Sequence, residues 1–236
     1  MTLERSSPTG FKLSHGGDHV LTLEENYLSR YKKPEPLSKY KFYRFKPATS
    51  YPRSQGGTLR PPSGDNLFTL LYEDKELREF TRDLFKKFGL SIVLKPHEAT
   101  IELQRQIEEG VVVSTPYALA SEGLQMLVFH YASIHTSKGS VLIFEEPESR
   151  TFPFYVNFLA ERIAKYSDEN TFYISTHNPY LLQTLIEKTS AAQLAVFVAY
   201  IEQGKTKLSK LTLDQLESIL DQGPATFFNL EELIKP

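Results

Sequence analysis

An acidic pair follows a short, wholly apolar segment near the middle of the chain. Val141–Phe144 leads directly into Glu145 and Glu146, and Pro147 and Glu148 continue the acidic stretch. A buried strand that ends in acids places its carboxylates at the carboxyl edge of a parallel sheet, where ligands bind in open α/β proteins. The spacing therefore predicts a ligand site that carries carboxylates at this edge.

A histidine ends a second β-rich segment. Thr171–Ser175 reads as a strand, and Thr176 and His177 follow it. A neutral imidazole can donate a hydrogen bond to an anion, and a protonated imidazole would bind the anion more strongly. Asn178 and Pro179 then begin a predicted helix, because proline is tolerated in a first helical turn.

A third candidate site is the helix start at Ser121-Glu122-Gly123-Leu124-Gln125. Serine can cap a helix, and glycine allows another backbone to approach closely. The unpaired N–H groups and the positive potential of a helix N-terminus favour an anion.

These three motifs, in this order and at these separations, resemble the C-terminal half of an ATP-binding-cassette (ABC-type) ATPase. The similarity is to the branch that contains RecF, SMC and OLD-like proteins, and it covers residues 40–220. The implied fold is α/β and P-loop NTPase-like, with a mostly parallel sheet flanked by helices. An irregular, basic N-terminal segment would precede this lobe, so we expect domains at residues 1–66 and 67–236.

The resemblance assigns roles to individual residues. It makes Glu146 the catalytic Walker B glutamate and His177 the switch histidine, which hydrogen-bonds the γ-phosphate of ATP. Glu145 stands where the family has the aspartate that holds the Mg²⁺ shell, so an extra methylene separates the carboxylate from its usual place. The resemblance also implies that three residues of the signature loop bind ATP, namely Ser121, Gly123 and Gln125. Since this loop contacts ATP on a second head in the family, head-to-head dimerisation is expected.

Each motif also fits an ordinary structural role when it is considered alone. The acidic tetrad could simply cap a strand and feed a turn, Ser121 could be a plain helix cap, and His177 could sit in a strand-end turn. Ser149–Pro153 occupies the place of the family's dimer-contacting loop, but Arg150 and Thr151 depart from its pattern. The other histidines show no metal-ligand spacing, and we expect His130 and His135 to lie on the surface of a helix.

No Gly-x-x-x-x-Gly-Lys-Ser/Thr phosphate loop occurs in the 236 residues. The resemblance therefore implies a phosphate-loop lobe supplied in trans, or a fragment, or a degenerate homologue. Without the backbone cradle and lysine of that loop, ATP phosphates lose most of their ligands. We expect the isolated chain to bind ATP poorly and to show no measurable hydrolysis.

Composition excludes several other classes of protein. Cysteine is absent, which rules out disulfides and thiolate metal sites and fits a cytoplasmic protein. No apolar run approaches the ~18 residues of a membrane span, so no membrane partner is expected. Residues 1–60 contain 11 basic and 5 acidic residues. Aromatic side chains interleave with these charges, so this segment is a candidate for DNA binding or, alternatively, an edge strand with a charged face. The aromatic residues concerned are Tyr27, Tyr31, Tyr40, Phe42, Tyr43 and Phe45.

Hydrophobic periodicity predicts the elements that position these residues. In residues 1–66 only Tyr40–Phe45 reads as a strand. The predicted helices are 67–88, 121–134, 155–163, 180–186 and 212–220. The predicted strands are 90–94, 99–107, 111–113, 141–144, 171–175, 194–201 and 207–211.

Two other functions compete with an ATPase half. One is a non-catalytic scaffold or regulatory module that keeps the fold and docks to a true ATPase. The other is an OLD-type nuclease, which needs a metal-binding domain after the ATPase. Beyond His177 no apolar strand ends in Glu-Gly or Asp-x-Asp, which disfavours the nuclease.

Overall fold

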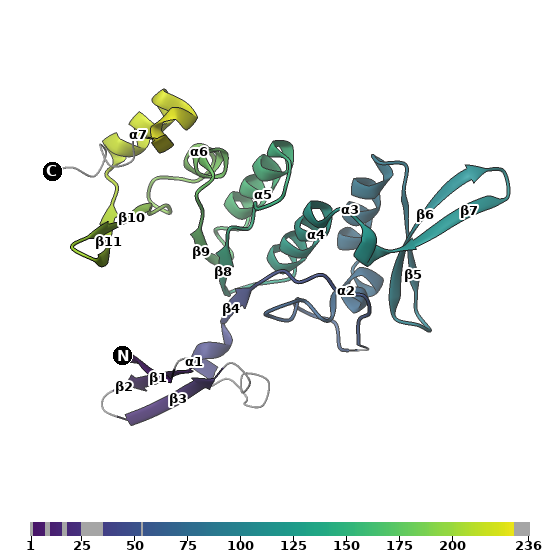
Figure 1. Ribbon diagram of the computed structural model, residues 1–236, viewed down its shortest axis with the longest axis horizontal. Coiled ribbons are helices and arrows are strands. Elements are labelled where there is room, and N and C mark those ends of the chain that lie inside the picture. Colours follow the sequence, from purple (N-terminus) through teal and green to yellow (C-terminus); the bar gives the residue numbers. More distant parts are fainter. Residues whose placement is uncertain (1, 8–9, 16–17, 25–34, 53, 229–236) are drawn as a thin grey trace. The chain divides into compact units, whose positions relative to one another are not determined.

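The chain forms two compact units, Met1–Lys39 and Tyr40–Pro236. The structure is a computed structural model that describes residues 2–7, 10–15, 18–24, 35–52 and 54–228 (Figure 1). The division after Lys39 differs from the predicted domain boundary at residue 66. The reason is that strand β4 (Tyr40–Tyr43) pairs with a strand about 100 residues later and so belongs to the second unit.

The N-terminal unit contains a small antiparallel sheet in the order β1-β2-β3, followed by a short helix. Its elements are β1 (Thr2–Ser7), β2 (Gly10–His15), β3 (Asp18–Glu24) and α1 (Glu35–Ser38). The prediction of an irregular segment with no strand before Tyr40 is therefore wrong for residues 2–7, 10–15 and 18–24. Apolar residues are few in these strands, as at Leu3 in β1 and at Phe11 and Leu13 in β2, so their periodicity is a weak strand signal. Tyr27 and Tyr31 of the proposed nucleic-acid segment lie outside the described residues.

A three-stranded parallel sheet in the order β4-β8-β9 is the centre of the second unit. Strand β8 (Val141–Glu145) pairs with β4 on one side and with β9 (Thr171–Ser175) on the other. Tyr43, Leu142 and Phe144 share one face of this sheet and are buried. This arrangement confirms the predicted α/β class with parallel strands and flanking helices.

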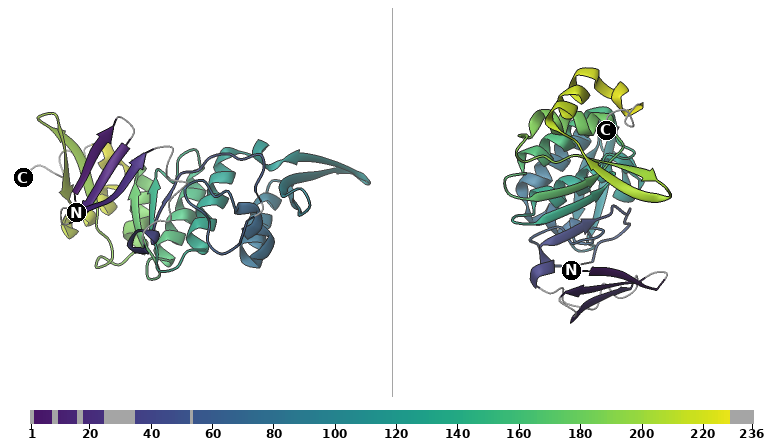
Figure 2. Two further views of the ribbon diagram at one scale, coloured as in Figure 1. Left: turned by 90° about the horizontal axis from the view of Figure 1, so that it is seen from below. Right: turned by 90° about the vertical axis from the view of Figure 1, so that its left-hand side faces the viewer.

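Helices α4 (Glu122–His135), α5 (Pro153–Lys165) and α6 (Pro179–Lys188) lie in a row beside the sheet (Figures 1 and 2). Each confirms a predicted helix. None of the helices in the described part of the chain is long and apolar enough to cross a lipid bilayer.

A helical and antiparallel region follows β4 along the chain. The predicted helix 67–88 is instead two helices, α2 (Leu67–Glu73) and α3 (Lys75–Lys86). Asp74 between them is extended, and its carboxylate accepts a hydrogen bond from the Leu77 N–H at 2.9 Å, which starts a new helix. The next sheet, in the order β5-β6-β7, confirms the three predicted strands. Its strands are β5 (Ser91–Lys95), β6 (Thr100–Glu108) and β7 (Val111–Pro116), and a 3₁₀ turn, η1 (Tyr117–Leu119), leads into α4.

The C-terminal elements also match their prediction. Strands β10 (Phe197–Glu202) and β11 (Lys205–Lys210) form the expected hairpin. Helix α7 (Leu213–Gln222) begins with a capping box between Thr212 and Gln215, and a 3₁₀ segment, η2 (Gly223–Phe228), follows it.

Candidate functional site

The two predicted catalytic side chains are in contact at the carboxyl edge of the sheet. Glu146 Oε1 lies 3.0 Å from His177 Nδ1. The Glu146 backbone N–H donates to the Ser175 carbonyl at 2.8 Å, which extends the β8–β9 register by one residue past Glu145. Both side chains remain substantially exposed, at 44% for Glu146 and 79% for His177. The neighbouring strands therefore bring together an acid and an imidazole that are 31 positions apart, at a place open to a ligand.

The turn after β8 is held in an unusual backbone conformation. Glu146 and Arg150 have positive φ angles of 43° and 61°. Non-glycine residues rarely adopt this region, and such residues cluster at active sites and ligand clamps.

Glu148 connects this turn to the His177 segment from inside the protein. Its side chain is buried, and its Oε1 accepts a hydrogen bond from the Thr176 hydroxyl. The Thr176 hydroxyl oxygen in turn accepts the Asn178 backbone N–H at 2.9 Å. Burial raises the pKa of the Glu148 carboxyl, and Oε2 has no hydrogen-bond partner among the described residues. The sequence analysis gave Glu148 no role of its own, because its burial depends on the packing of two distant loops.

The first turn of α4 packs directly against the turn that contains Arg150. Gly123 is buried, and a Cβ placed on it would meet the Arg150 carbonyl oxygen well inside van der Waals distance. The Arg150 guanidinium also forms an ion pair with Glu122. Gly123 thus has a structural reason to be glycine, which is the close backbone approach that was predicted for this position.

A Gly123→Ala substitution is expected to destabilise the protein by about 1–3 kcal/mol, the usual cost of overpacking a tight contact. The added methyl group would have to push the Arg150 backbone away from α4. Urea unfolding of both proteins measures this, with Gly139→Ala as a control for a glycine that has no atom within 4 Å of such a Cβ. Since Gly139 has a positive φ of 58°, its substitution reports backbone strain alone. A Gly123→Ala variant as stable as the wild type would contradict the close contact at Gly123.

The other two signature-loop residues differ in their surroundings. Ser121 is exposed at the N-cap of α4, and its side chain makes no capping hydrogen bond. Gln125 is buried, and its amide donates to the Ala120 carbonyl at 2.9 Å. The Gln125 amide N–H group therefore supports the start of the helix, while its Oε1 has no hydrogen-bond partner among the described residues. The role of Gln125 in ATP binding stays a prediction.

A cavity of about 350 Å³ lies between α4, the end of β4 and the turn after β8. Its charged side chains include two arginines and three glutamates. The lining residues are Tyr43, Arg44, Phe45, Glu122, Met126, His130, Glu145, Glu146, Ser149 and Arg150. Arg150 pairs with Glu122, and Glu146 pairs with His177, whereas Glu145 and Arg44 have no ion-pair partner in the described part of the chain. The cavity thus offers one uncompensated carboxylate and one uncompensated guanidinium.

The metal-binding capacity of this cavity is limited. No group of three or more His, Cys, Asp or Glu side chains among the described residues could hold a metal ion. Mg²⁺ commonly uses only one or two carboxylates and completes its octahedron with water and substrate phosphates. Glu145 fits a Mg²⁺ site of this type, in which the protein supplies a minority of the ligands.

His130 is a cavity residue that the sequence analysis placed on the surface, and that prediction is wrong. It is 2% exposed and packs edge-on against Phe129 and Phe144. Burial lowers the pKa of His130 to about 4, so the ring is neutral at pH 7. His135, expected on the same surface, is partly buried and contacts Asp74 at 3.0 Å. The near-continuous apolar character of 124–134 could have indicated a helix buried on all sides.

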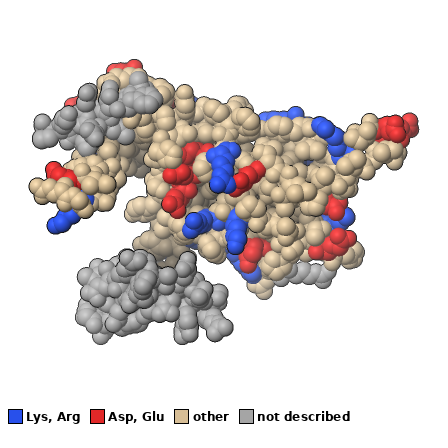
Figure 3. All heavy atoms as spheres, in the orientation of Figure 1, with Lys and Arg blue, Asp and Glu red and all other residues tan. Residues whose placement is uncertain are grey.

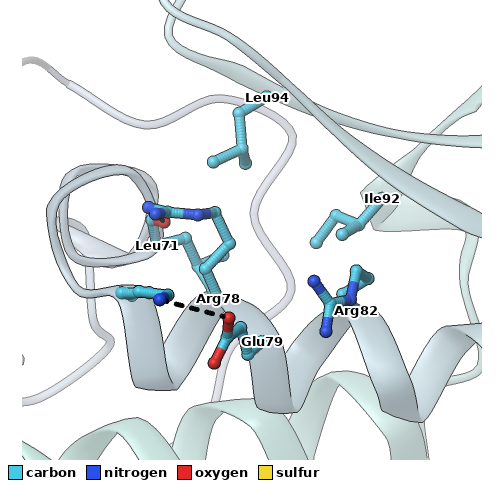
Figure 4. A pocket seen from close by; sticks show the side chains of 7 residues that line it. Leu71, Arg78, Glu79, Arg82, Ile92 and Leu94 are labelled. Atoms are coloured by element: carbon cyan, nitrogen blue, oxygen red, sulfur yellow. Dashed lines mark hydrogen bonds and ion pairs between the residues drawn. The ribbon is translucent and has the colours of Figure 1, made fainter.

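A second cavity, of about 300 Å³, lies between α3 and β5 (Figure 4). The Arg78 guanidinium donates to the carbonyls of Leu71 and Tyr72, and Lys75 lies 3.9 Å from Glu79. Arg78 thus binds the carbonyls at the end of α2, and Lys75 and Glu79 neutralise each other's charge. The polar groups of this cavity therefore have structural roles.

The described side chains of the second unit include charges of both signs. Figure 3 shows basic and acidic side chains interspersed on the face it draws, without a broad area of one sign. Tyr43 is 1% exposed and Phe45 packs against the core, so these two aromatic rings cannot stack on bases. Tyr43 and Phe45 thus serve the core, whereas Tyr40 and Phe42 of β4 are 40% and 42% exposed, and DNA binding by the N-terminal segment stays a prediction.

The fold and site define an α/β protein in which an acid and an imidazole meet at the carboxyl edge of a parallel sheet. The family model described as "AAA domain, putative AbiEii toxin, Type IV TA system" matches residues 19–183, and the chain belongs to this family. This confirms the resemblance at the level of an AAA-type ATPase domain. No curated protein matches the chain.

Solved structures with a similar course of the chain are heads of SMC proteins. One, reported with ATP-driven dimerization and DNA-stimulated activation of SMC ATPases, is 16% identical, with a TM-score of 0.44 over 66% of this chain and 96% of that one. The Smc head with coiled coil and joint from Pyrococcus yayanosii is 17% identical, with a TM-score of 0.42 over 62% of this chain and 28% of that one. The Smc head bound to the C-terminal domain of ScpA from Pyrococcus furiosus is 16% identical, with a TM-score of 0.42 over 62% and 37%. The chain therefore spans less than two fifths of the two Pyrococcus chains.

Proposed function

We propose that this chain is the C-terminal part of an ABC-type ATPase head of the RecF/SMC/OLD-like branch. A phosphate loop from outside these 236 residues would complete the nucleotide site, and ATP would be hydrolysed where two heads meet. The observation that carries the proposal is the 3.0 Å pair of Glu146 and His177 at the carboxyl edge of the parallel sheet. That is where an open α/β sheet binds its ligand.

The groups of the site fit the charge changes of phosphoryl transfer to water. Glu146 can accept a hydrogen bond from the attacking water and orient it. The protonated His177 ring can donate from Nδ1 to Glu146 and from Nε2 to a phosphate oxygen. Their contact holds the acid and the imidazole on the same side of the site. The turn that carries Glu146 has a strained backbone, which is common where residues are held for a ligand.

The cavity beside this pair suits a phosphate group accompanied by a divalent cation. Glu145 is the residue that would hold Mg²⁺, and the ion, when bound, would neutralise developing charge on the phosphate oxygens. Arg44 follows β4 where Glu145 ends the neighbouring strand β8, has no ion-pair partner among the described residues, and is a candidate phosphate contact. Ser121 at the start of α4 is free to contact a phosphate on a second head.

One face of the central sheet supports the idea of a missing lobe. Phe42, Ile143 and Tyr173 lie in register across β4, β8 and β9, on the face opposite the buried Leu142. Phe42 is 42% exposed and Tyr173 is 62% exposed. Parallel sheets are normally covered on both faces, so an apolar face of this kind calls for a covering element.

A scaffold function is the second candidate, favoured by the glutamate at position 145. The longer side chain moves the carboxylate roughly 1.5 Å from the family's position, and Mg²⁺ tolerates little displacement of its ligands. A protein that keeps the fold but has lost tight Mg²⁺ binding would dock to a true ATPase without hydrolysing ATP itself.

Purification of the chain with its natural partners tests the proposal. We expect a stoichiometric component that carries a Gly-x-x-x-x-Gly-Lys-Ser/Thr loop, and ATP hydrolysis by the complex. Tyr173→Glu, which places a charge on the exposed sheet face, should release that component, while Ile201→Glu on the exposed β10–β11 hairpin should not. A complex that forms but never hydrolyses ATP would favour the scaffold.

A further inference from the structure

The side chain of His177 is exposed, so packing does not fix its position. The imidazole is 79% exposed, and it contacts Glu146 at 3.0 Å. A contact between exposed charged groups contributes little, because water screens the charges and both side chains can rotate. The position of His177 therefore depends on how its backbone segment is held.

The Thr176 hydroxyl holds the backbone on both sides of His177. It donates a hydrogen bond to Oε1 of Glu148, and its oxygen accepts the Asn178 backbone N–H at 2.9 Å. The Asn178 side chain in turn caps α6 by accepting two backbone N–H groups of the first helical turn. Residues 176–178, which connect β9 to α6, are thus tied together at one hydroxyl group.

The turn after β8 holds Glu148 in place. The Ser149 N–H donates to the Glu146 carbonyl at 3.0 Å, and the Thr151 N–H donates to the Glu148 carbonyl at 3.2 Å. The Thr151 hydroxyl donates to the same carbonyl. One turn therefore presents two carboxylates to the His177 segment, with Glu146 at the surface and Glu148 in the interior.

A glutamate is a costly residue at the buried position 148. Its side chain is 4% exposed, and Oε2 has no hydrogen-bond partner among the described residues. An apolar side chain of the same size would avoid the cost of burying these oxygens. Burial raises the pKa of Glu148, but the neutral acid and the carboxylate both offer an oxygen that can accept from Thr176. The hydrogen bond to Thr176 is what an apolar side chain could not provide.

We infer that Glu148 is a positioning residue, which holds His177 against Glu146 through the Thr176 hydroxyl. Glu148 acts from inside the protein, whereas the pair that it positions is exposed to a ligand. This inference rests on the proposed function for its effect on ATP hydrolysis. The position of His177 itself can be measured on the chain alone.

Nitrogen-15 NMR of the full chain, labelled at histidine, measures this position without ATP. The Nδ1 resonance of His177 reports its contact with Glu146, and Glu146→Ala supplies the resonance of a ring without that contact. Glu148→Met keeps the length of the side chain and removes the acceptor. We expect it to move the Nδ1 resonance most of the way to the position seen in Glu146→Ala. Glu148→Gln keeps an acceptor oxygen and should leave the resonance near its wild-type position.

Threonine variants test the other partner of the hydrogen bond. Thr176→Val keeps the shape of the side chain and removes the hydroxyl, so it should shift His177 as Glu148→Met does. Thr176→Ser keeps the hydroxyl and should behave as the wild type. The matched control is Thr184→Val, because the Thr184 hydroxyl of α6 donates to Asn157 of α5 at 3.1 Å. This control should leave the His177 resonance unchanged.

Urea unfolding separates positioning from a general loss of structure. Glu148→Met combined with Thr176→Val removes both partners of the buried hydrogen bond, and such a replacement can be nearly neutral for stability. We therefore expect a double variant that is about as stable as the wild type but has lost the contact of His177 with Glu146. Thr176→Val alone decides the question if Glu148→Met does not fold, because Thr176 is only partly buried.

ATP hydrolysis by the completed head separates the inference from the proposed function. Since misplaced catalytic groups lower rates steeply, Thr176→Val should reduce kcat about 10–100-fold and change KM much less. If Thr176→Val shifts His177 but hydrolyses ATP at the wild-type rate, the inference stands and the proposed role of His177 is wrong. A His177 resonance that keeps its wild-type position in Thr176→Val would overturn the inference, whatever the rate of hydrolysis.

Discussion

A Glu146→Gln variant of the completed ATPase is expected to lose ATP turnover by a factor of about 10²–10⁴, the usual contribution of a general base. Glutamine keeps the size of the side chain and can still contact His177, but it cannot take a proton from the attacking water. ATP should therefore stay bound instead of being released as ADP. Turnover and the amount of trapped nucleotide, measured together in the reconstituted complex, check this result.

A matched control for this variant is Glu187→Gln, which removes an exposed carboxylate of α6 at a distance from the site. It should hydrolyse ATP at the wild-type rate. An unchanged rate in Glu146→Gln would make the Glu146–His177 pair a structural contact and would support the scaffold function instead.

The second large effect concerns the buried His130 and the pH dependence of stability. Burial lowers the pKa of His130 to about 4, against about 6.5 in an unfolded chain, so the unfolded state binds the proton more readily between these values. The contribution of the neutral His130 to the free energy of unfolding is therefore fully present above pH 6.5 and is lost as the pH drops toward 4. From the size of this pKa difference, the loss between pH 7 and pH 4.5 is roughly 2–3 kcal/mol.

A His130→Leu variant should lack this loss, since leucine is apolar and does not titrate. Urea unfolding of both proteins at pH 7 and at pH 4.5 measures the difference, and carboxylates that titrate in the same range cancel in the comparison. Glu148 acts in the opposite direction, because its raised pKa lowers stability as the pH rises. Equal losses in the two proteins would contradict a buried, neutral His130.

The elements around the site could be predicted because their signals are local. Uninterrupted apolar runs marked β8 and β9, and the Asn178-Pro179 start marked α6, whose cap accepts from the N–H groups of Tyr180 and Leu181. The meeting of Glu146 and His177 followed from these strands, because parallel neighbours end at the same edge of a sheet. Spacing along the chain was thus sufficient to predict that Glu146 and His177 meet.

Other features depend on packing that spacing does not reveal. Asp74 divides one apolar-periodic stretch into α2 and α3, because its own carboxylate caps the second helix. Gln125 and Glu148 have polar side chains that the sequence suggests are exposed, but tertiary contacts bury both. His130 was misplaced for the same reason, since only the packing of α4 against β8 shows that its ring is enclosed.

The position of β4 shows how a long-range contact determined the domain boundary. Tyr40–Tyr43 was predicted as a strand, but its partner could not be identified from the sequence. Its parallel pairing with β8 makes it a strand of the central sheet and places its end beside the cavity. Arg44, whose guanidinium has no ion-pair partner among the described residues, is placed at the site by this pairing.

The central claim is that this chain holds one side of a nucleotide site that needs a phosphate loop from elsewhere. Equilibrium binding of Mg·ATP, measured by calorimetry on the chain alone and on the chain with its phosphate-loop partner, tests it most directly. We expect micromolar binding by the complex, loss of much of that affinity in Glu145→Gln, and no saturable binding by the chain alone. Micromolar binding by the chain alone, or no binding by a stable complex, would contradict the claim.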